Sequence, residues 1–256
     1  MKGNLLKYPG RKWSKHESLW NEEGLRPHLP VTELFTPQSF KKMIEQHPVV
    51  FLKPDLGMRG QGIVKVSRVK EGECTIQTAS KTYKRRGASS AARRLKKLIG
   101  GKRYIVQQGI DLIRIKGRPV DFRILLHKTN GKWKFFGIMG KVAAKNRFVT
   151  NYARGGKAIR LQEALSKAFG NEKLGDVNWD ERLKSLSLQL AEALQKYYPN
   201  VTELGLDVAI DADQRIWLLE ANTRPQYQLF RHHANRGLYA RIASSVRSVR
   251  AAKQQR

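Results

Sequence analysis

A glycine-rich loop between two apolar strands is the feature that most limits how this chain can fold. Residues 49–67 read VVFLKPDLGMRGQGIVKVS, an apolar run followed by three glycines spaced G-x-x-G-x-G and then an alternation of apolar and basic residues. A tight hairpin needs only about two to five loop residues, and this loop is longer. Its many backbone N–H groups lie beside Lys53, a combination that suits a polyphosphate ligand.

The composition indicates a globular protein. The chain has 256 residues, of which 40% are hydrophobic, enough for one large domain or for two lobes that share a core. No apolar run approaches the roughly 20 residues that span a bilayer, and the N-terminal sequence lacks the apolar core of a secretory signal. A single cysteine, Cys74, excludes an internal disulfide and a zinc–cysteine cluster. We therefore expect a cytoplasmic protein.

The strong positive charge is unevenly distributed. The net charge is +29, residues 81–103 contain ten basic residues and no acidic one, and no acidic residue follows Glu220. Such a field attracts polyanions, including nucleic acid, anionic lipid and cell-wall polymer. A basic face that only increases solubility is the alternative. The chain lacks helix-turn-helix, zinc-finger and aromatic RNA-binding signatures, which argues against specific nucleic-acid recognition.

The first half of the chain predicts a small α+β lobe after an irregular lead-in. A helix is expected near residues 36–46, with Thr36 or Ser39 as its cap and Pro37 in its first turn. A second helix over 89–99 would be capped by Ser89 or Ser90 and stopped by two glycines. The expected strands alternate or are continuously apolar, and they cover residues 49–53, 63–69, 73–79 and 104–110.

The second half predicts a larger antiparallel lobe. Strands over 120–128 and 132–144 are joined by Asn130-Gly131, which favours a tight hairpin turn. A helix over 177–198 presents leucines on one face, with Asn178 and Glu181 arranged like a capping box. Two strands, 204–210 and 215–222, and a helical basic tail follow. We divide the α+β chain into a lead-in (1–48), a small lobe (49–107), a large lobe (108–230) and a tail (231–256), with the ligand site in the cleft between the lobes.

Three oxygen-bearing side chains suit a magnesium ion. Asp207 lies in one expected strand, and Glu220 and Asn222 lie two apart in the next, so these two point to the same sheet face. If the strands pair through the turn near Asp213, position 207 lies opposite about position 220. Phosphoryl chemistry requires such a hard cation held by oxygen ligands. An ion pair between Glu220 and Arg224 at the strand end is the alternative.

The ordered set of these motifs resembles the ATP-grasp fold, from about Val49 to Gln226. It comprises a strand lysine with a glycine-rich loop, a hinge strand, an Asp-x-Arg strand, a basic strand, and an Asp followed by Glu-x-Asn. More narrowly, GRKWSKHESL, LRPHLPVTELFTP, VVFLKPDLGMRGQGI, QQGIDLI, DFRILLHK and NYARGGKAI are similar to the YheC/YheD branch, which is associated with the coats of bacterial endospores. Only about 48 residues precede the strand of Lys53, too few for the domain that precedes this fold in most relatives.

The resemblance implies roles for the nucleotide-binding residues. Lys53 would contact the phosphates of ATP, and the loop from Gly57 to Gly62 would cover the β and γ phosphates. The adenine would bind to backbone groups near Gln108 and Ile110, and many relatives have Glu where Gln107 and Gln108 stand. The remaining residues implied to bind ATP or the bridging Mg²⁺ ions are Arg59 and Gly60 in the loop, Asp111 at the ribose, and the metal ligands Asp207, Glu220 and Asn222.

The resemblance also implies three basic catalytic residues. Arg123 would hold the γ-phosphate or an acyl phosphate, Lys141 would neutralise phosphate charge in the transition state, and Arg154 lies in a loop that would close on the substrate. Without the resemblance, an arginine on an antiparallel strand reads as a solvent-facing residue. His127 and the His232-His233 pair lack the partner spacing of a metal site, and we assign them no catalytic role.

The family chemistry is ATP-dependent activation of a carboxylate as an acyl phosphate, which an amine or another nucleophile attacks. The leading hypothesis is such a ligase acting on an anionic small molecule, peptide or coat or wall polymer, attracted by the basic surface. One alternative is a non-enzymatic, nucleotide-binding scaffold of the spore coat. Another is a basic protein that binds nucleic acid or other polyanions, which the Glu-x-Asn strand argues against.

Overall fold

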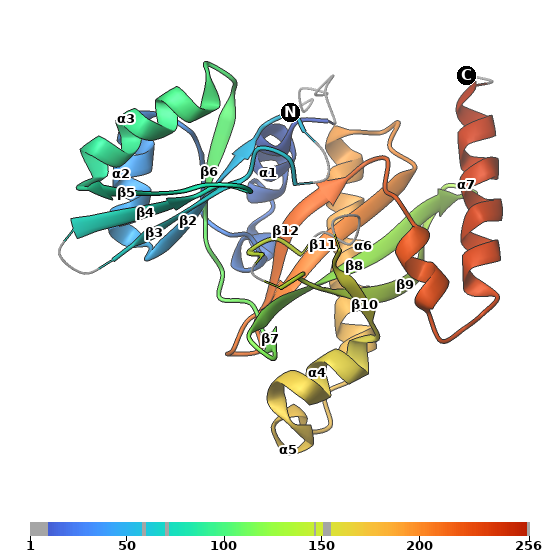
Figure 1. Cartoon of the computed structure of the whole chain (residues 1–256). Helices are drawn as coiled ribbons and strands as arrows, with labels where there is room; N and C mark the ends of the chain where they lie inside the picture. The colour runs from blue at the N-terminus through green and yellow to red at the C-terminus, as the bar shows by residue number, and fades with distance from the viewer. Residues whose placement is uncertain (1–9, 58–59, 70–71, 146, 151–154, 255–256) are drawn as a thin grey trace. The chain divides into compact units, whose positions relative to one another are not determined.

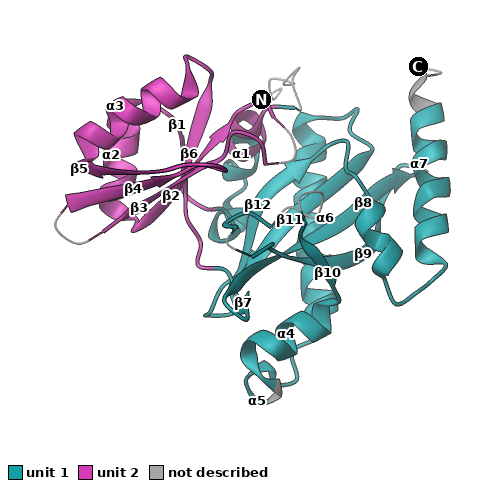
Figure 2. Ribbon diagram, viewed as in Figure 1, with its two compact units in different colours: residues 1–10, 17–29, 112–256 teal, residues 11–16, 30–111 magenta. Residues whose placement is uncertain are grey.

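The computed structural model describes residues 10–57, 60–69, 72–145, 147–150 and 155–254. They form two compact units, shown in different colours in Figure 2. Unit 2 comprises residues 11–16 and 30–111, and unit 1 comprises the other described residues. The lead-in is thus divided between the units, and the basic tail belongs to unit 1. No described helix is long and apolar enough to cross a membrane.

Unit 2 is an antiparallel sheet covered by two helices (Figure 1). The helices α2 (Pro37–Gln46) and α3 (Ala88–Ile99) contact each other, and residues such as Phe40 and Leu95 form a core with the strand residues Val50 and Leu52. The strands lie in the order β1 (Thr32–Leu34), β6 (Tyr104–Gln108), β2 (Val49–Pro54), β3 (Val64–Arg68), β4 (Glu73–Gln77) and β5 (Thr82–Arg86).

The caps of these helices were predicted with mixed success. Thr36 caps α2 as expected: its side chain accepts from the Ser39 N–H, and Ser39 returns a bond to the Thr36 N–H. The expected serine cap of α3 is wrong. The helix follows Gly87, whose φ of 78° takes the chain directly from β5 into the helix without a side-chain cap. The edge strand β5 and the short strand β1 were not predicted.

Unit 1 is a second antiparallel sheet with helices on both faces. Its strand order is β10 (Lys157–Ile159), β9 (Lys132–Val142), β8 (Arg118–Thr129), β11 (Glu203–Ile210) and β12 (Ile216–Asn222), and β7 (Arg114–Ile115) pairs with β8. Along β8, Ile124 and Leu126 belong to the core that includes α6 (Trp179–Tyr197), whereas Leu125 belongs to the core that includes α7 (Leu238–Gln254). Because side chains alternate along a strand, the two helices cover opposite faces.

The turns and helix ends of unit 1 follow their sequences. Asn130 and Gly131 have φ values of 51° and 75° and close the hairpin of β8 and β9 as predicted. Asn178 caps α6 by accepting from the Glu181 N–H. The helical tail is confirmed as α7. Elements that were not predicted include α1 (Lys12–Trp20), η1 (Glu23–His28), α4 (Leu161–Phe169) and α5 (Asn171–Leu174); η4 (Gln228–His232) precedes α7.

Two polar contacts hold α7 against the sheet. The fully buried His127 of β8 contacts Ser245 through its Nδ1, at 2.8 Å from the hydroxyl oxygen. Arg250 donates two bonds of 2.9 Å to Glu203, a strand residue that is only 1% exposed. His127 and Glu203 lie directly opposite each other on β8 and β11. The histidine therefore has a structural position between the sheet and α7.

Candidate functional site

The strand register of unit 1 brings the predicted metal ligands to one place. Asp207 of β11 lies opposite Glu220 of β12, as the sequence predicted, and opposite Arg123 of β8 on its other side. Asn222 lies opposite Gly205, two residues from Asp207. Residues directly opposite on antiparallel strands have their side chains on the same sheet face. The sheet thus gathers the metal candidates and one predicted catalytic arginine on one surface.

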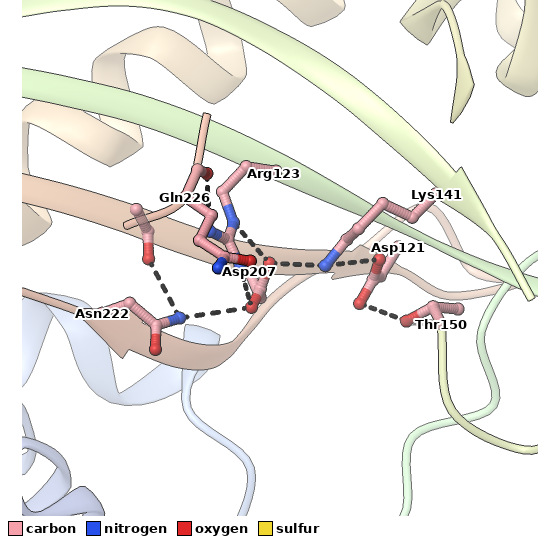
Figure 3. A network of polar contacts seen from close by, with 8 residues as sticks. Asp121, Arg123, Lys141, Thr150, Asp207, Asn222 and Gln226 are labelled. Carbon is pink, nitrogen blue, oxygen red and sulfur yellow. Dashed lines mark hydrogen bonds and ion pairs between the residues drawn. The ribbon is translucent and has the colours of Figure 1, made fainter. Parts of the chain in front are cut away.

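Asp207 is the centre of a hydrogen-bonded network within unit 1 (Figure 3). Its Oδ1 accepts from Arg123 Nε at 2.8 Å and from Lys141 Nζ at 2.6 Å, and its Oδ2 accepts from Arg123 Nη2 at 2.9 Å. Asn222 Nδ2 lies 3.4 Å from the same Oδ2. Arg123 also approaches the Gln226 carbonyl oxygen at 3.5 Å. The arrangement unites two predicted metal ligands with two predicted catalytic cations.

The network is largely shielded from water, and this sets its electrostatics. The side chains of Lys141, Asp207 and Arg123 are only 9%, 12% and 15% exposed. Burial by itself would raise the pKa of Asp207, but the charges of Arg123 and Lys141 outweigh this effect and hold the pKa far below its ordinary value. Burial by itself would lower the pKa of Arg123, but the charge of Asp207 outweighs this effect, and the pKa is raised. The charge of Glu220 also acts to raise it. Asp207 is therefore ionised at neutral pH.

Asp121 extends the network on the other side of Lys141. It lies opposite Lys141 on β8 and β9, with Oδ1 at 3.1 Å from the ammonium group, and its Oδ2 accepts from the Thr150 hydroxyl. Burial raises the pKa of Asp121 to about 6, against the opposing charge of Lys141 and with the help of the Asp207 charge. Lys141 is therefore shared by two buried carboxyl groups. The sequence analysis named the Asp-x-Arg strand but gave Asp121 and Thr150 no role.

The donor set fits a magnesium ion that is shared with a phosphate ligand. Asp207 and Glu220 supply carboxylate oxygens and Asn222 supplies an amide oxygen, the hard ligands that Mg²⁺ prefers. Among the described residues there is no group of three or more His, Cys, Asp or Glu side chains that could hold a metal. Mg²⁺ is commonly bound through one or two carboxylates and completed by substrate phosphates, and this set suits that mode.

In unit 2, a chain of hydrogen bonds fixes the position of Lys53. Thr32 donates its hydroxyl proton to the Pro30 carbonyl at 2.8 Å, so its oxygen is left to accept from Gln107 Nε2 at 3.0 Å. The amide of Gln107 must then present its oxygen to Lys53, whose ammonium group donates to it. Lys53 is thus oriented by a neutral acceptor. The sequence analysis missed this function of the Gln107 side chain.

His16 is a second residue near Lys53 that the sequence analysis missed. It lies on α1, within the part of that helix that belongs to unit 2. Burial, with a contribution from the charge of Lys53, lowers the pKa of His16 to about 4. The histidine is therefore neutral at pH 7 and adds no positive charge beside the lysine. It lies within GRKWSKHESL, a segment that supported the family resemblance without indicating a role for the histidine.

The glycine-rich loop is held at its start by a buried carboxylate. Asp55 is fully buried and forms ion pairs of 3.1 Å with both Arg11 and Arg103, and it accepts from the Trp13 N–H at 2.9 Å. Further along, Gly62 has a φ of 72°, and an added Cβ there would lie 2.8 Å from the Tyr104 hydroxyl. Only glycine fits that position.

The residues expected to bind adenine and ribose lie at the end of unit 2. The Gln108 N–H donates to the Val31 carbonyl at 2.8 Å, and the Gln108 side chain accepts from the Val31 N–H at 3.1 Å. The lead-in thus occupies the backbone N–H and the side-chain oxygen of Gln108. Ile110 follows β6, and Asp111 is exposed.

The predicted site residues are divided between the two units. Arg123, Lys141, Asp207, Glu220 and Asn222 cluster in unit 1. Unit 2 holds the predicted nucleotide-binding residues Lys53, Gly57, Gly60, Gly62, Gln108, Ile110 and Asp111. Arg59 and Arg154 lie outside the described residues.

Comparison with known proteins identifies relatives along most of the chain. Residues 7–247 match the family described as YheC/D like ATP-grasp. The endospore coat-associated protein YheD of Bacillus subtilis (strain 168) is 30% identical over 230 residues, covering 86% of this chain and 49% of that protein. The endospore coat-associated protein YheC of the same strain is 23% identical, covering 86% of this chain and 64% of that protein. The chain thus spans about half to two thirds of these relatives.

A solved structure shows the same fold. The ATP-grasp ligase PsnB, complexed with its minimal precursor, superposes with a TM-score of 0.53 at 14% identity, covering 92% of this chain and 60% of that chain. At that identity the likeness concerns the fold alone: the mixed α+β architecture of the two units is that of ATP-grasp proteins. With the match over residues 7–247, the chain belongs to the YheC/D-like ATP-grasp family.

Proposed function

We propose that the protein is an ATP- and Mg²⁺-dependent ligase that activates a carboxylate as an acyl phosphate. The observation that carries the proposal is the network on Asp207, where two cations and an amide converge on a buried carboxylate opposite Glu220. Burying such charges is costly, and a hydrophobic set of similar volume would serve the fold as well or better. A requirement for phosphate and metal binding explains why they are there.

In the proposed reaction, a carboxylate oxygen of the substrate attacks the γ-phosphorus of ATP, and the bond from that phosphorus to the β–γ bridging oxygen breaks. ADP leaves, and an amine then attacks the acyl phosphate carbonyl, losing a proton as phosphate departs. Arg123 and Lys141 would neutralise the transferring phosphoryl group, and Lys53 would hold the other phosphates. Asp207, Glu220 and Asn222 would hold Mg²⁺, which would neutralise phosphate charge.

The substrate is proposed to be anionic. The net charge of +29 would draw in an acidic small molecule, peptide or wall or coat polymer. Two relatives carry names that associate them with the endospore coat, and we extend that association to this chain as part of the proposal.

The proposal is tested by ADP release against a panel of carboxylates and amines, with and without Mg²⁺. Calorimetry with ATP and adenosine gives a second readout. Lys53→Met should weaken the binding of ATP by about 1.5 to 3 kcal/mol, as expected for a lost charge-assisted contact, and should leave the binding of adenosine almost unchanged. Glu220→Ala should reduce the dependence of ATP binding on Mg²⁺.

The outcomes separate an enzyme from a scaffold. ADP release that requires Mg²⁺ and one member of the panel supports the ligase. Tight ATP binding without turnover on any acceptor would favour a nucleotide-binding scaffold. Equal ATP affinity with and without Mg²⁺, for both the wild type and Glu220→Ala, would refute the metal assignment.

A further inference from the structure

The carboxylate that a metal would need is already neutralised by the protein's own cations. Arg123 donates to both oxygens of Asp207, at 2.8 and 2.9 Å, and Lys141 donates to Oδ1 at 2.6 Å. These are short, charge-assisted bonds in a shielded place, since Asp207 is only 12% exposed at its side chain. A divalent cation at the same oxygens would be repelled by an ammonium and a guanidinium group.

Arg123 and Lys141 need another anion if they are to leave Asp207. Both side chains are largely buried, at 15% and 9% exposure, and a buried cation without a partner is strongly unfavourable. Asp121 offers Lys141 one such partner at 3.1 Å. Arg123 has the Gln226 carbonyl at 3.5 Å, which is neutral and distant, and the charges of Asp121 and Glu220, which also act on it. A phosphate group satisfies the requirement for both cations, because it accepts several charge-assisted bonds.

The structure also provides room for Arg123 beside Asp207. Gly205 lies two residues before Asp207 on β11, and a Cβ added there would lie 2.5 Å from Pro225 Cβ, 3.1 Å from Arg123 Nη1 and 3.3 Å from Arg123 Cδ. All three distances are tighter than ordinary contacts. A larger residue at this position would therefore press on both Pro225 and the Arg123 side chain.

We propose that Arg123 and Lys141 act as exchangeable counter-ions of Asp207, which keep metal out until a nucleotide phosphate takes them over. This inference rests on the proposed function and concerns the order of binding at its site. Without nucleotide, both cations stay on Asp207 and the carboxylate is a poor metal ligand. With nucleotide, they turn to the phosphates and Asp207 becomes available. Metal and nucleotide then strengthen each other's binding, whereas metal alone binds weakly.

The inference predicts that one substitution changes the affinities of two ligands in opposite directions. Lys141→Gln removes a charge but keeps an amide donor for Asp207. This variant should bind Mn²⁺ alone about tenfold more tightly than the wild type, because one competing cation is gone. It should bind ATP in the presence of EDTA about tenfold more weakly than the wild type, because one cationic partner of the phosphates is gone. Arg123→Gln should act in the same direction. Mn²⁺ binding is followed by the paramagnetic resonance of the free ion and ATP binding by calorimetry.

Two controls isolate the exchange at Asp207. Lys132→Gln removes the same charge at an exposed position near the other end of β9, and it should change neither affinity. Adding Asp207→Asn to Lys141→Gln should abolish the gain in Mn²⁺ affinity. Thermal unfolding of each variant verifies that it folds, and if Lys141→Gln does not, Arg123→Gln provides the same comparison.

The results distinguish this inference from the proposed function. If the wild type binds ATP more tightly with Mg²⁺ but the folded variants bind Mn²⁺ alone no tighter than the wild type, the counter-ion exchange is refuted and the ligase proposal stands. If the wild type binds no ATP with or without Mg²⁺, the proposed function is refuted. Opposite shifts for Mn²⁺ and ATP, absent in Lys132→Gln, support the exchange.

Discussion

The buried histidine that holds α7 should make the stability of unit 1 depend on pH. His127 is fully buried, and burial lowers its pKa to about 4, with Glu203 and Arg250 as the neighbouring charges. The ordinary value, which the unfolded chain has, is about 6.5. Between these values the unfolded chain carries a proton on His127 that the folded protein lacks. Stability therefore falls as pH falls through this range and is fully present above it.

The magnitude follows from the two pKa values. From about pH 7 to about pH 5, the contribution of His127 should decrease by roughly 2 kcal/mol. Asp121 acts in the opposite direction. Because its pKa is raised to about 6, its contribution to the stability of the folded protein is present at low pH and is lost as pH rises. The wild-type profile is thus a sum, and a variant is needed to isolate the histidine. His127→Asn places an amide near Nδ1 and removes the titration.

The assay is urea denaturation of the wild type and His127→Asn at several pH values, with hydrogen exchange of α7 amides to report unit 1 separately. The stability difference between the two proteins should shrink by roughly 2 kcal/mol between about pH 7 and pH 5. Ser245→Ala is the matched control: it removes the Nδ1 contact, costs about 1 kcal/mol, and should preserve the pH dependence. A difference that stays constant across this range would refute the reasoning.

Three further predictions concern other parts of the chain. Gln107→Glu should lower the affinity for ATP about tenfold and leave the affinity for adenosine unchanged, both measured by calorimetry, because a carboxylate would neutralise Lys53. Gly62→Ala should destabilise the protein by about 1 to 3 kcal/mol in thermal unfolding, since its φ of 72° and the nearby hydroxyl leave no space for a Cβ. Residues 81–103 and 231–256 should bind DNA, RNA and anionic wall polymer alike, with affinities that fall steeply between roughly 50 and 200 mM salt. Sequence-selective binding at the higher salt would contradict this last prediction.

The sequence predicted best those elements whose signal is local. Asn-Gly between two apolar runs determined the β8–β9 hairpin, and the Thr36 cap with Pro37 determined where α2 begins. The expectation for α3 failed because its start depends on the edge strand β5, whose exposed and half-buried residues show no apolar pattern. No element was predicted between residues 144 and 177, although this segment contains β10 and α4. Short elements of this kind are defined by partners that are distant in sequence.

The pairing of Lys141 with Asp121 could not be predicted by counting residues outward from the hairpin turn. Near the turn, Leu126 lies opposite Phe135, but Leu125 lies opposite Gly137, so Phe136 is an extra residue in β9. Without this bulge, Asp121 would lie opposite Gly140, and Lys141 would point to the other face of the sheet, since a one-residue slip inverts a strand's faces.

A second bulge acts in the same way on β12. Val208 lies opposite Leu218, whereas Asp207 lies opposite Glu220, so Leu219 is the extra residue and Glu220 is turned to the face of Asp207. Two separate irregularities on two strands thus bring a lysine and a glutamate to one buried aspartate. A sheet serving only as a scaffold would need neither bulge, and apolar side chains on this face would avoid the desolvation of these charges. The proposed function accounts for both the bulges and the charges, because in that proposal this end of the sheet binds a highly charged ligand.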